Sequence, residues 1–348
     1  MTGKRALRWC SEFVLVAVVL LGSGCSTVGY LWQAAGGQMT LYNRERPVDE
    51  VIADPLVSSR VKGRLMLLKE LKKLVEKELG VKATANYTTY VDIKRPYVVW
   101  VVSAAPPFEI KARTWSFPIA GAVPYLGYFR EEGARSKAVE LEQEGFDTYV
   151  RGATAYSTLG WLRDPLLSSM LSDEDGEMAN LLFHETTHDH VYIGGQSGFN
   201  EGAASFIGEY GERFYLEKRF GTDSEPVRQW TLRREKRRQR ALEVKTFAQS
   251  LQRYYTESAG LDEGVRRAVK EERFRTFGKG FKNNATLVAY LTYEDDQDVF
   301  DGVYKKCGGS LLGSLRYLAK FSEQYENLAK KASSARPQEL LSSWDEGC

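Results

Sequence analysis

All three histidines of this 348-residue chain lie between residues 184 and 190, in the pattern His184-Glu185-x-x-His188 followed by His190. On a helix, positions i and i+4 lie one above the other on the same face, so His184 and His188 can bind one metal ion. Glu185, one position further round, is then placed to reach a water molecule on that metal. His190 lies about 200° round a helix from His188, so we expect it to point away from the metal and to be solvated or hydrogen bonded.

The residues around this motif indicate where its helix begins and ends. Ser172 is a candidate N-cap, and the acidic residues that follow it suit the first turn, where the helix dipole stabilises negative charge. Apolar residues continue the buried face as far as Val191, and Gly194-Gly195 is the expected stop. The sequence therefore predicts a helix with one buried face between Ser172 and Gly194.

A catalytic zinc site needs three protein ligands and one open position for water, so two histidines leave one ligand to be found. The stretch Phe199–Glu209 is rich in Ala, Gly and Ser, which predicts a second helix packed closely on the first. Glu201 stands on this helix, after room for a turn, and is the leading candidate for the third ligand. Glu209, two turns further on, is the alternative ligand. If it is not a ligand, we expect it to hydrogen-bond to a metal-binding side chain and to orient that side chain.

The arrangement resembles that of the gluzincin metallopeptidases, in which an Asn-Glu pair on the next helix supplies the third ligand, here Asn200-Glu201. Longer stretches are similar to the putative zinc aminopeptidase family of Gram-negative bacterial lipoproteins. The similar segments are 37–38, 46–48, 94–100, 115–118, 127–129, 155–161, the histidine segment and 283–285, and the similarity extends to about residue 325. The resemblance implies an α+β zincin fold with a small mixed or antiparallel sheet, an active-site helix carrying the His-Glu-x-x-His motif and a largely helical C-terminal part.

Two further expectations come from the resemblance. Relatives are expected to carry cysteines where this chain has Ser116 and Ala122, so a crosslink of the family would be absent here without effect on the chemistry. In gluzincins, a strand near the metal-binding helix holds the substrate by backbone pairing. The candidate for this strand is Ala155–Trp161. Its small and polar members are Ser157, Thr158 and Gly160.

The motif predicts hydrolysis of peptide bonds by water that zinc activates. Zinc lowers the pKa of its bound water to about 7, and Glu185 would take the proton of that water and pass it to the leaving amine. The carbonyl oxygen needs one more donor opposite the metal. Because no histidine is left for this task, a tyrosine hydroxyl is expected. The candidates are Tyr156, Tyr192, Tyr290 and Tyr293, although for each one taken singly an aromatic core residue is the better interpretation.

The first residues predict export and lipid attachment. Three basic residues, the last of them Arg8, precede the apolar run Phe13–Leu21, which is too short to span a bilayer and is typical of a signal peptide. The run leads into Leu21-Gly22-Ser23-Gly24-Cys25, which looks like a lipobox. We therefore expect residues 1–24 to be removed and Cys25 to carry the lipid. An ordinary secretory signal or a short N-terminal anchor is the alternative.

The expected lipid places the protein in the cell envelope. Several acyl chains hold a protein stably on a membrane where a single chain does not. By resemblance to the lipoprotein sorting rule, Ser26 after Cys25 favours the inner leaflet of the outer membrane, with the protein facing the periplasm. The lipid on Cys25 is therefore the expected membrane contact.

The charge balance gives no reason to expect nucleic acid as a partner. Residues 1–24 contain three basic residues and one acidic residue, so their removal takes the formal net charge from +2 to 0. Arg233–Arg240 is the most basic run, and we expect it to form a solvated helix face. Contact of this run with anionic lipid headgroups is the alternative. The apolar stripe of the same helix is Trp230, Leu242, Phe247 and Leu251.

Two of the four cysteines are expected to remain as free thiols after processing. Cys10 would be lost with the signal peptide and Cys25 would be modified, which leaves Cys307 and Cys348. In an oxidising periplasm we expect these two to pair and to tie down the C-terminus. A disordered Cys348, as the last residue, is the alternative.

The rest of the mature chain is long enough for one large core or two subdomains. Helices are predicted near 57–79 and over 131–143, strands over 84–130 with 97–102 the clearest, and a strand or hairpin over 146–160. The chain beyond Tyr210 is expected to be mostly helical, with one helix beginning at Asn283-Asn284. The expected organisation is a signal peptide (1–24), an anchor and tether (25–37), a sheet-containing peptidase part with both metal-binding helices (38–210) and a helical part that completes the cleft (211–348).

Together these features predict a zinc-dependent peptidase that is anchored to the envelope membrane and acts on a peptide or protein substrate. The resemblance favours an aminopeptidase, and a zinc endopeptidase is the alternative within the same chemistry. Two non-catalytic alternatives are an envelope scaffold lipoprotein with a zincin fold and a zinc carrier. A scaffold has no reason to keep Glu185, and a carrier should offer more ligands. The sequence indicates neither the identity of the substrate nor the oligomeric state.

Overall fold

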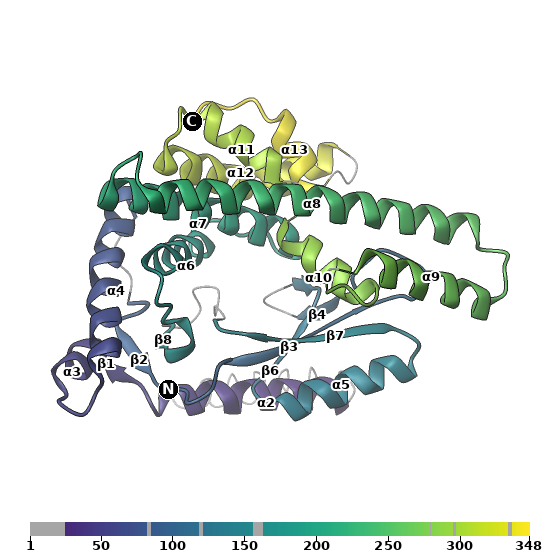
Figure 1. Ribbon diagram of the computed structural model, residues 1–348, viewed down its shortest axis with the longest axis horizontal. Coiled ribbons are helices and arrows are strands. Elements are labelled where there is room, and N and C mark those ends of the chain that lie inside the picture. Colours follow the sequence, from purple (N-terminus) through teal and green to yellow (C-terminus); the bar gives the residue numbers. More distant parts are fainter. Residues whose placement is uncertain are drawn as a thin grey trace, which may run out of the picture.

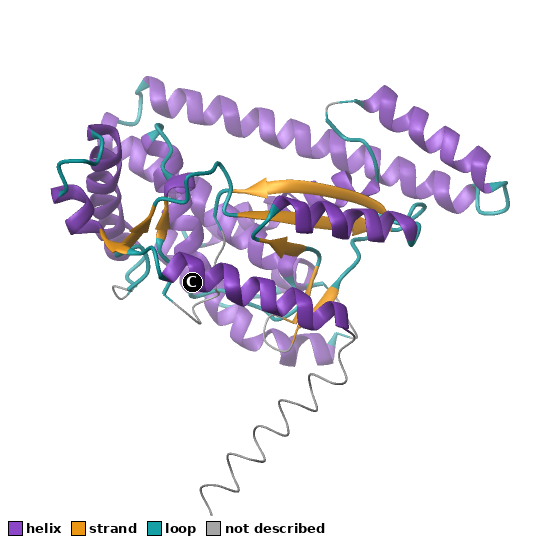
Figure 2. Ribbon diagram, turned by 90° about the horizontal axis from the view of Figure 1, so that it is seen from below, coloured by secondary structure: helices purple, strands orange, loops and turns teal. Residues whose placement is uncertain are grey.

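The computed structural model describes residues 25–81, 85–117, 121–155, 163–278, 280–294, 297–332 and 336–348. In this part of the chain the fold is mixed α+β and mostly helical, with three small sheets (Figures 1 and 2). Figure 1 shows the long helix α8 (Glu225–Glu257) crossing the molecule above the strands, while α2 (Cys25–Tyr42) and α5 (Glu131–Gln143) lie below them. The predicted α+β class with small sheets and a largely helical C-terminal part is confirmed.

The largest sheet is antiparallel and has the strand order β6–β3–β7. Its strands are β3 (Val99–Ala105), β6 (Leu126–Tyr128) and β7 (Asp147–Ala153). The central strand β3 confirms the strand predicted from the β-branched run at 97–102. It pairs with β7 along its whole length, which places the C-terminal end of β7 beside Val99.

Helices cover both faces of this sheet. Alternate residues of β3 point to opposite sides, so each face of the strand packs against a different helix. Val102 and Ala104 pack against α5, and Ala105 packs on the other side against α10 (Asn284–Glu294). A strand enclosed on both faces needs apolar residues on both, which explains the nearly unbroken apolar run in its sequence. The same packing places α10 alongside β7, from Asp147 near the start of α10 to Arg151 near its end.

Two smaller sheets complete the β structure of the described residues. β2 (Thr89–Val91) pairs antiparallel with β1 (Arg46–Pro47) and parallel with β8 (Leu166–Leu167). β4 (Trp115–Phe117) and β5 (Gly121–Val123) form a hairpin in which Ser116 lies directly opposite Ala122. These are the two positions at which relatives are expected to carry cysteines, and directly opposed residues of a hairpin are close enough for a disulfide.

Helices α6 (Asp175–His188) and α7 (Ser197–Phe220) pack side by side and carry the predicted metal ligands. Small residues of α7 allow the close approach, as the sequence predicts, since a Cβ atom added at Gly211 would lie 2.2 Å from the ring of Phe183. Asn200 holds the connection between the helices: its side chain accepts from Ile193 N (2.8 Å) and donates to Ile193 O (2.9 Å). Glu201, the next residue, is thereby held near the start of α7.

The N-terminal end of α6 differs from the prediction. The helix begins at Asp175 with Glu174 as its N-cap residue, whereas the sequence favours Ser172. Ser172 lies before the helix, where its hydroxyl accepts from Glu174 N (3.1 Å) and donates to Glu177. A side-chain turn of this kind uses the same residue types as an N-cap, so the sequence alone does not separate the two.

The C-terminal end of α6 also differs, because the helix stops at His188 and not at Gly194-Gly195. The backbone N–H groups of residues 189–191 turn back onto the carbonyls of Thr186 and Thr187. Val191 then packs into the core from the connecting loop. Burial in a loop produces the same apolar signal as one more helical turn, and this explains the error.

Helix α8 packs on two separate clusters. Trp230 packs against Tyr210 of α7 (ring centroids 6.2 Å apart), whereas Leu251 packs with Tyr255 in a second cluster. Leu242 lies between them and is 67% exposed, so the predicted continuous apolar stripe is wrong at this residue. The prediction assumed one core along the whole helix, but the helix bridges two.

The remaining described helices are α3 (Val48–Ala53), α4 (Ser59–Glu78), α9 (Glu263–Phe277), α11 (Gln297–Lys306), α12 (Leu311–Lys331), α13 (Pro337–Ser343) and the short η1 (Ser168–Met170). The helices predicted near 57–79, over 131–143 and from Asn283-Asn284 are confirmed as α4, α5 and α10. Residues 25–37, expected as a tether, lie within α2. No helix in the described part of the chain combines the length and the apolar character that crossing a bilayer requires.

The predicted disulfide between Cys307 and Cys348 is present, with Cα atoms 5.3 Å apart. It joins the residue that follows α11 to the C-terminal residue. The C-terminal segment also packs through Trp344, whose ring contacts Tyr317 and Phe321 of α12. Both contacts hold this segment against the helices above α8 (Figure 1).

Candidate metal centre

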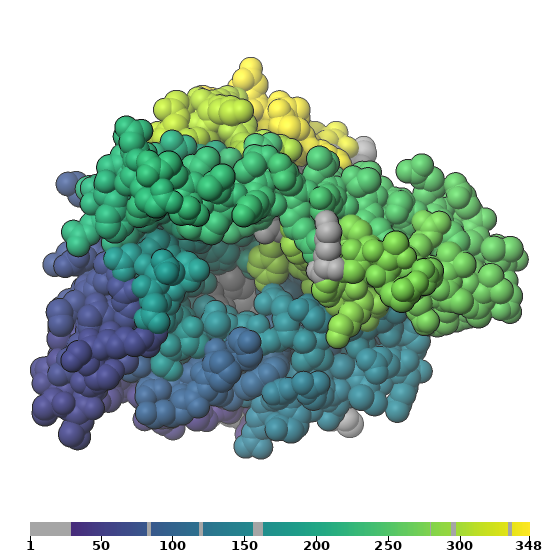
Figure 3. All heavy atoms as spheres, in the orientation of Figure 1, coloured from purple at the N-terminus to yellow at the C-terminus, as the bar shows by residue number. Residues whose placement is uncertain are grey.

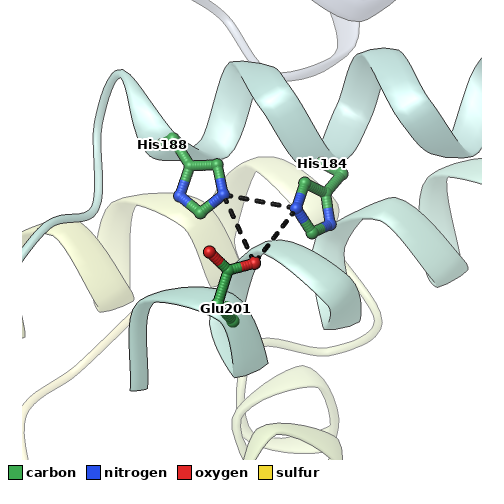
Figure 4. A group of neighbouring side chains, drawn as sticks. All are labelled: His184, His188 and Glu201. Atoms are coloured by element: carbon green, nitrogen blue, oxygen red, sulfur yellow. Dashed lines mark hydrogen bonds and ion pairs between the residues drawn. The ribbon is translucent and has the colours of Figure 1, made fainter. Parts of the chain in front are cut away.

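The three predicted ligands converge on one point between α6 and α7 (Figure 4). Nε2 of His184 lies 3.2 Å from Nε2 of His188. One carboxylate oxygen of Glu201 lies 3.6 Å from the first of these nitrogens and 3.8 Å from the second. The histidines come from successive turns of α6 and Glu201 comes from α7, so the arrangement depends on the close packing of the two helices.

The spacing of these donor atoms fits a zinc ion. With zinc–nitrogen and zinc–oxygen bonds of about 2.0–2.2 Å, tetrahedral ligand atoms lie roughly 3.3 Å apart. The observed separations of 3.2, 3.6 and 3.8 Å are close to this value, so small side-chain movements would complete the geometry. Two imidazoles and one carboxylate are also a donor set of catalytic zinc sites that keep a fourth position open.

The other two candidates lie apart from this group. Glu209, the alternative ligand, is on α7, but its carboxylate is bound by Arg234 (3.2 Å) and Arg237 (3.0 Å). Among the described residues, the group of convergent donors contains Glu201 and not Glu209. His190 lies beyond the end of α6 and is exposed, which agrees with the prediction that it points away from the site.

Burial and mutual charge determine the protonation of the three convergent side chains. Burial lowers the pKa of His188 to about 4 despite the nearby Glu201 carboxylate, so its imidazole is neutral and offers a lone pair. Burial also opposes charge on His184, but the hydrogen bond to Glu201 and the charges of Glu185 and Glu201 together outweigh burial and raise the pKa of His184. Burial favours a neutral Glu201, but the two imidazoles outweigh it and lower the pKa of Glu201.

Glu185 lies in the same cleft as the convergent donors. Burial raises the pKa of its carboxyl group to about 7, while His184 opposes this shift and the charge of Glu201 adds to it. A carboxyl group with a pKa near neutrality both accepts and releases a proton at ordinary pH. This property favours general acid–base catalysis.

The convergent donors face a cleft of about 850 Å³. Its walls come from α6 and α7 on one side and from β3, β6 and β7 on the other, with residues of α2 and α8 at its edges. Figure 3 shows a hollow between the part of the molecule coloured green and the strand-bearing part coloured blue. A cleft of this volume accommodates a peptide segment or another small ligand.

Two tyrosines, Tyr125 and Tyr293, lie in the cleft close enough to Glu201 for its charge to affect them. Tyr293 is on α10, and its hydroxyl accepts a hydrogen bond from Arg151 Nη2 (2.9 Å) on β7. Burial, together with the charge of Glu201, raises the pKa of Tyr293 to about 12. The hydroxyl therefore keeps its proton and is able to donate it in a hydrogen bond.

The other predicted tyrosines are placed differently. Tyr192 lies in the loop after α6 and is not among the residues that line the cleft, although it is close enough to the cleft residue Tyr125 for its charge to affect that group. Tyr290 packs against Phe281, with ring centroids 5.5 Å apart. Tyr156 lies outside the described residues, as do Ser157, Thr158 and Gly160 of the predicted substrate strand. The segment immediately before them, 151–155, lines the cleft.

Sequence reasoning did not identify Arg151. The signal that could have found it is weak: it is the one basic residue of β7, between aromatic, small and polar neighbours. Its proximity to Tyr293 arises from the pairing of β7 with β3 and from the packing of α10 on the same sheet. The residues around Arg151 in the sequence show no pattern that predicts either contact.

The basic run of α8 is mostly exposed, as predicted for a solvated face, and it also forms ion pairs. Its ion pairs include Arg233–Glu212, Arg234–Glu209, Arg234–Asp301, Arg237–Glu209 and Arg238–Asp298. The acidic partners belong to α7 and α11, so these ion pairs connect α8 to both of these helices. Arg233 and Arg237 also line the cleft. The sequence does not indicate these pairs, because the acidic partners are distant in the sequence.

The model of one protein family, described as putative aminopeptidase, matches residues 29–340. The chain belongs to the putative aminopeptidase family. The region matched to the putative aminopeptidase family extends from within α2 to within α13, so it contains the convergent donors, the cleft and the ion pairs of α8. No curated protein and no solved structure matches the chain. Membership in this family supports a peptidase.

Proposed function

We propose that this member of the putative aminopeptidase family is a zinc-dependent peptidase. The observation that carries the proposal is the convergence of donor atoms from His184, His188 and Glu201 within 4.8 Å of one another, with Glu185 beside them in an open cleft. A purely structural role explains neither the buried carboxyl group next to the donors nor the open space in front of them. The family description supports a peptide as the substrate.

Each residue has one task in the proposed reaction. Zinc held by His184, His188 and Glu201 would supply a Lewis acid and lower the pKa of water to about 7. Glu185 takes the proton of the attacking water and then delivers it to the leaving amine. Tyr293 donates a hydrogen bond to the carbonyl oxygen as negative charge develops on that atom.

Arg151 positions Tyr293 for this task. Its guanidinium group donates to the tyrosine oxygen and lies 5.3 Å from the centroid of the ring. Both contacts restrain the side chain, and the hydroxyl hydrogen stays available because the oxygen acts as the acceptor. The donor to the substrate is thus held in place before the substrate arrives, which reduces the reorganisation that the reaction requires.

The family description favours an aminopeptidase, and one observation keeps an endopeptidase as the second candidate. An aminopeptidase needs a carboxylate for the free α-amino group of its substrate. Apart from Glu185 and Glu201, the described residues of the cleft include the carboxylates of Glu177 and Glu212. Glu212 is already paired with Arg233, and Glu177 is exposed. Neither carboxylate is therefore a buried, unpaired partner for the α-amino group, and an endopeptidase stays the second candidate.

Peptide libraries that differ only at the amino end test the proposal. We expect the zinc-loaded protein to hydrolyse peptides, to lose activity when a chelator removes the zinc, and to regain it when zinc is restored. An aminopeptidase should cleave N-acetylated peptides at least about 100-fold more slowly than free ones. The acetylated peptide lacks the charged α-amino group that the site of an aminopeptidase binds. Equal cleavage of both libraries would identify an endopeptidase. No cleavage of either library by zinc-loaded protein would contradict the proposal.

We further propose that lipid on Cys25 anchors the protein in the inner leaflet of the outer membrane, facing the periplasm. The lipobox-like sequence before Cys25 supports this location. The variant Cys25→Ser is expected to keep residues 1–24 and to stay in the inner membrane, because the thiol that receives the lipid is absent. Mass spectrometry of the N-terminus and membrane fractionation measure the two effects. A mature wild-type chain with an unmodified N-terminus would show that the proposal is wrong.

A further inference from the structure

Helix α2 is the first described element and contains no charged residue along its whole length, Cys25–Tyr42. A surface helix of a water-soluble domain ordinarily carries charge on its outer face. The meaning of the missing charge depends on which face of α2 packs on the protein and which face is exposed.

The inner face of α2 is fixed on the edge of the main sheet. Gln33 donates to the carbonyl of Gly127 (3.0 Å) and accepts from the N–H of Phe129 (3.2 Å), much as a neighbouring strand would bond this edge. Tyr30 accepts from the N–H of Gly127 (3.2 Å). Three backbone groups of the β6 edge are thus satisfied by side chains of α2.

Close packing adds to these hydrogen bonds. A Cβ atom added at Gly37 would lie 2.1 Å from the ring of Phe129, so only glycine allows this approach. Tyr30 and Ala34 on the same face line the cleft. The rotation of α2 about its axis is therefore determined by its contacts with the body of the protein.

This rotation leaves an apolar stripe on the outer face. Leu31 is 44% exposed, Trp32 is 81% exposed and Met39 is 59% exposed. Leu31, the exposed Ala35 and Met39 are spaced four residues apart and so lie on one line, with Trp32 beside them. Side chains of this size in an uncharged stripe favour an apolar or interfacial environment over water.

We propose that this outer face, the stripe of Leu31, Trp32, Ala35 and Met39, lies in the headgroup region of a phospholipid bilayer. The choice of a bilayer rests on the proposed lipid at Cys25, because that residue is the first of α2 and a lipid there would hold the helix at the membrane surface. A tryptophan next to aliphatic side chains is typical of the membrane–water interface. The basic run of α8 is a weaker candidate for this contact, since its arginines are paired with carboxylates of α7 and α11.

The orientation of the cleft follows from this contact. Tyr30 and Ala34 belong to the inner face of the helix whose outer face lies on the bilayer. The thickness of one helix, about 10 Å, then separates this edge of the cleft from the lipid. Peptide segments close to the membrane surface would be the substrates that reach this edge most easily.

Vesicle binding by a chain produced without residues 1–24 and carrying Cys25→Ser tests the inference without any lipid or signal peptide on the protein. We expect this chain to bind vesicles of phosphatidylcholine alone about as well as vesicles that also contain phosphatidylglycerol, and to remain bound at high salt. Brominated phosphatidylcholine should quench a fluorescence component that disappears in Trp32→Phe. Replacing Leu31, Trp32 and Met39 together by glutamine should weaken binding at least about 10-fold, because the apolar contact area is lost.

A matched control separates this surface from apolar exposure in general. Leu56, Leu242 and Leu261 are 94%, 67% and 56% exposed on other elements, and replacing all three by glutamine should leave binding unchanged. Both triple variants should keep the parent melting temperature and zinc content, which excludes misfolding. Since the assay measures neither hydrolysis nor processing, its outcome is separate from that of the proposed function and of the lipid on Cys25.

Three results would overturn the inference. The first is a Cys25→Ser chain that binds neither kind of vesicle. The second is binding that requires phosphatidylglycerol and is lost at high salt, which would assign the contact to the basic run of α8. The third is a concentration-dependent dimer that the triple variant at Leu31, Trp32 and Met39 abolishes, which would make a second copy of the chain the occupant of this face.

Discussion

Replacing Glu185 by glutamine is expected to lower kcat by about 10²–10⁴-fold while zinc remains bound. The amide has nearly the same size and shape as the carboxyl group, so the packing around α6 should not change. It cannot take a proton, and the proposed reaction needs this group first as a base and then as an acid. Steady-state hydrolysis of a peptide, measured beside the zinc content of the same sample, checks both parts of the expectation.

The matched control for this variant is Glu174→Gln. Glu174 is the N-cap residue of the same helix, is exposed and makes no side-chain capping hydrogen bond. The identical chemical change there should leave kcat within about twofold, since surface substitutions away from such contacts have small effects. Full turnover in Glu185→Gln would remove this residue from the mechanism, whatever the zinc content.

Replacing Glu201 by alanine is expected to weaken zinc binding by more than about 100-fold, beyond the 10–100-fold that loss of a supporting residue causes. The variant loses the one carboxylate that converges with His184 and His188. The wild-type protein should hold about one zinc per chain, as a single site requires, and the variant should hold almost none. Elemental analysis after dialysis against a zinc buffer measures the difference, and hydrolysis should fall with the zinc content.

The variant Glu209→Ala distinguishes a ligand from a neighbouring carboxylate on the same helix. Its carboxylate pairs with Arg234 and Arg237, so its removal should lower the thermal stability of the contact between α7 and α8. Zinc affinity should change by less than about 10-fold, the lower end of the effect of a supporting residue. If Glu209→Ala lost its zinc and Glu201→Ala retained it, the ligand assignment would have to be exchanged.

The two enzyme variants also test different parts of the proposal. Glu185→Gln should be inactive with zinc bound, and Glu201→Ala should be inactive because zinc is absent. Added zinc should therefore restore no activity to the first and, at high concentration, part of the activity of the second. This contrast separates a role in proton transfer from a role in holding the metal.

Local sequence patterns are sufficient to predict the elements on which the candidate site is built. The spacing of His184 and His188 requires a helix if both are to face one point, and the small residues after Phe199 require a second helix close to it. Both helices are present as α6 and α7, and Glu201 lies with the histidines. These inferences succeed because helical periodicity and side-chain size act within a few turns of the chain and do not depend on distant residues.

The ends of elements were less predictable than their existence. α6 stops at His188, although the apolar pattern continues to Val191, because burial of a loop and burial of a helix give the same signal. Leu242 continues an apolar stripe in the sequence, yet it is exposed where α8 passes from one cluster to the next. In both cases the pattern shows that a residue is apolar but not what covers it.

The distant groups that complete the site are brought together by long-range packing. Arg151 and Tyr293 meet because β7 pairs with β3 and α10 packs on the same sheet. The arginines of α8 form a largely exposed face, as the sequence predicts, but the carboxylates that pair with them come from α7 and α11. A hydrogen-bond or ion-pair partner leaves no periodic signal in the residues around the group that it contacts, whereas a shared helix face does. For this reason the convergent donors could be predicted from the sequence, and the residues that surround them could not.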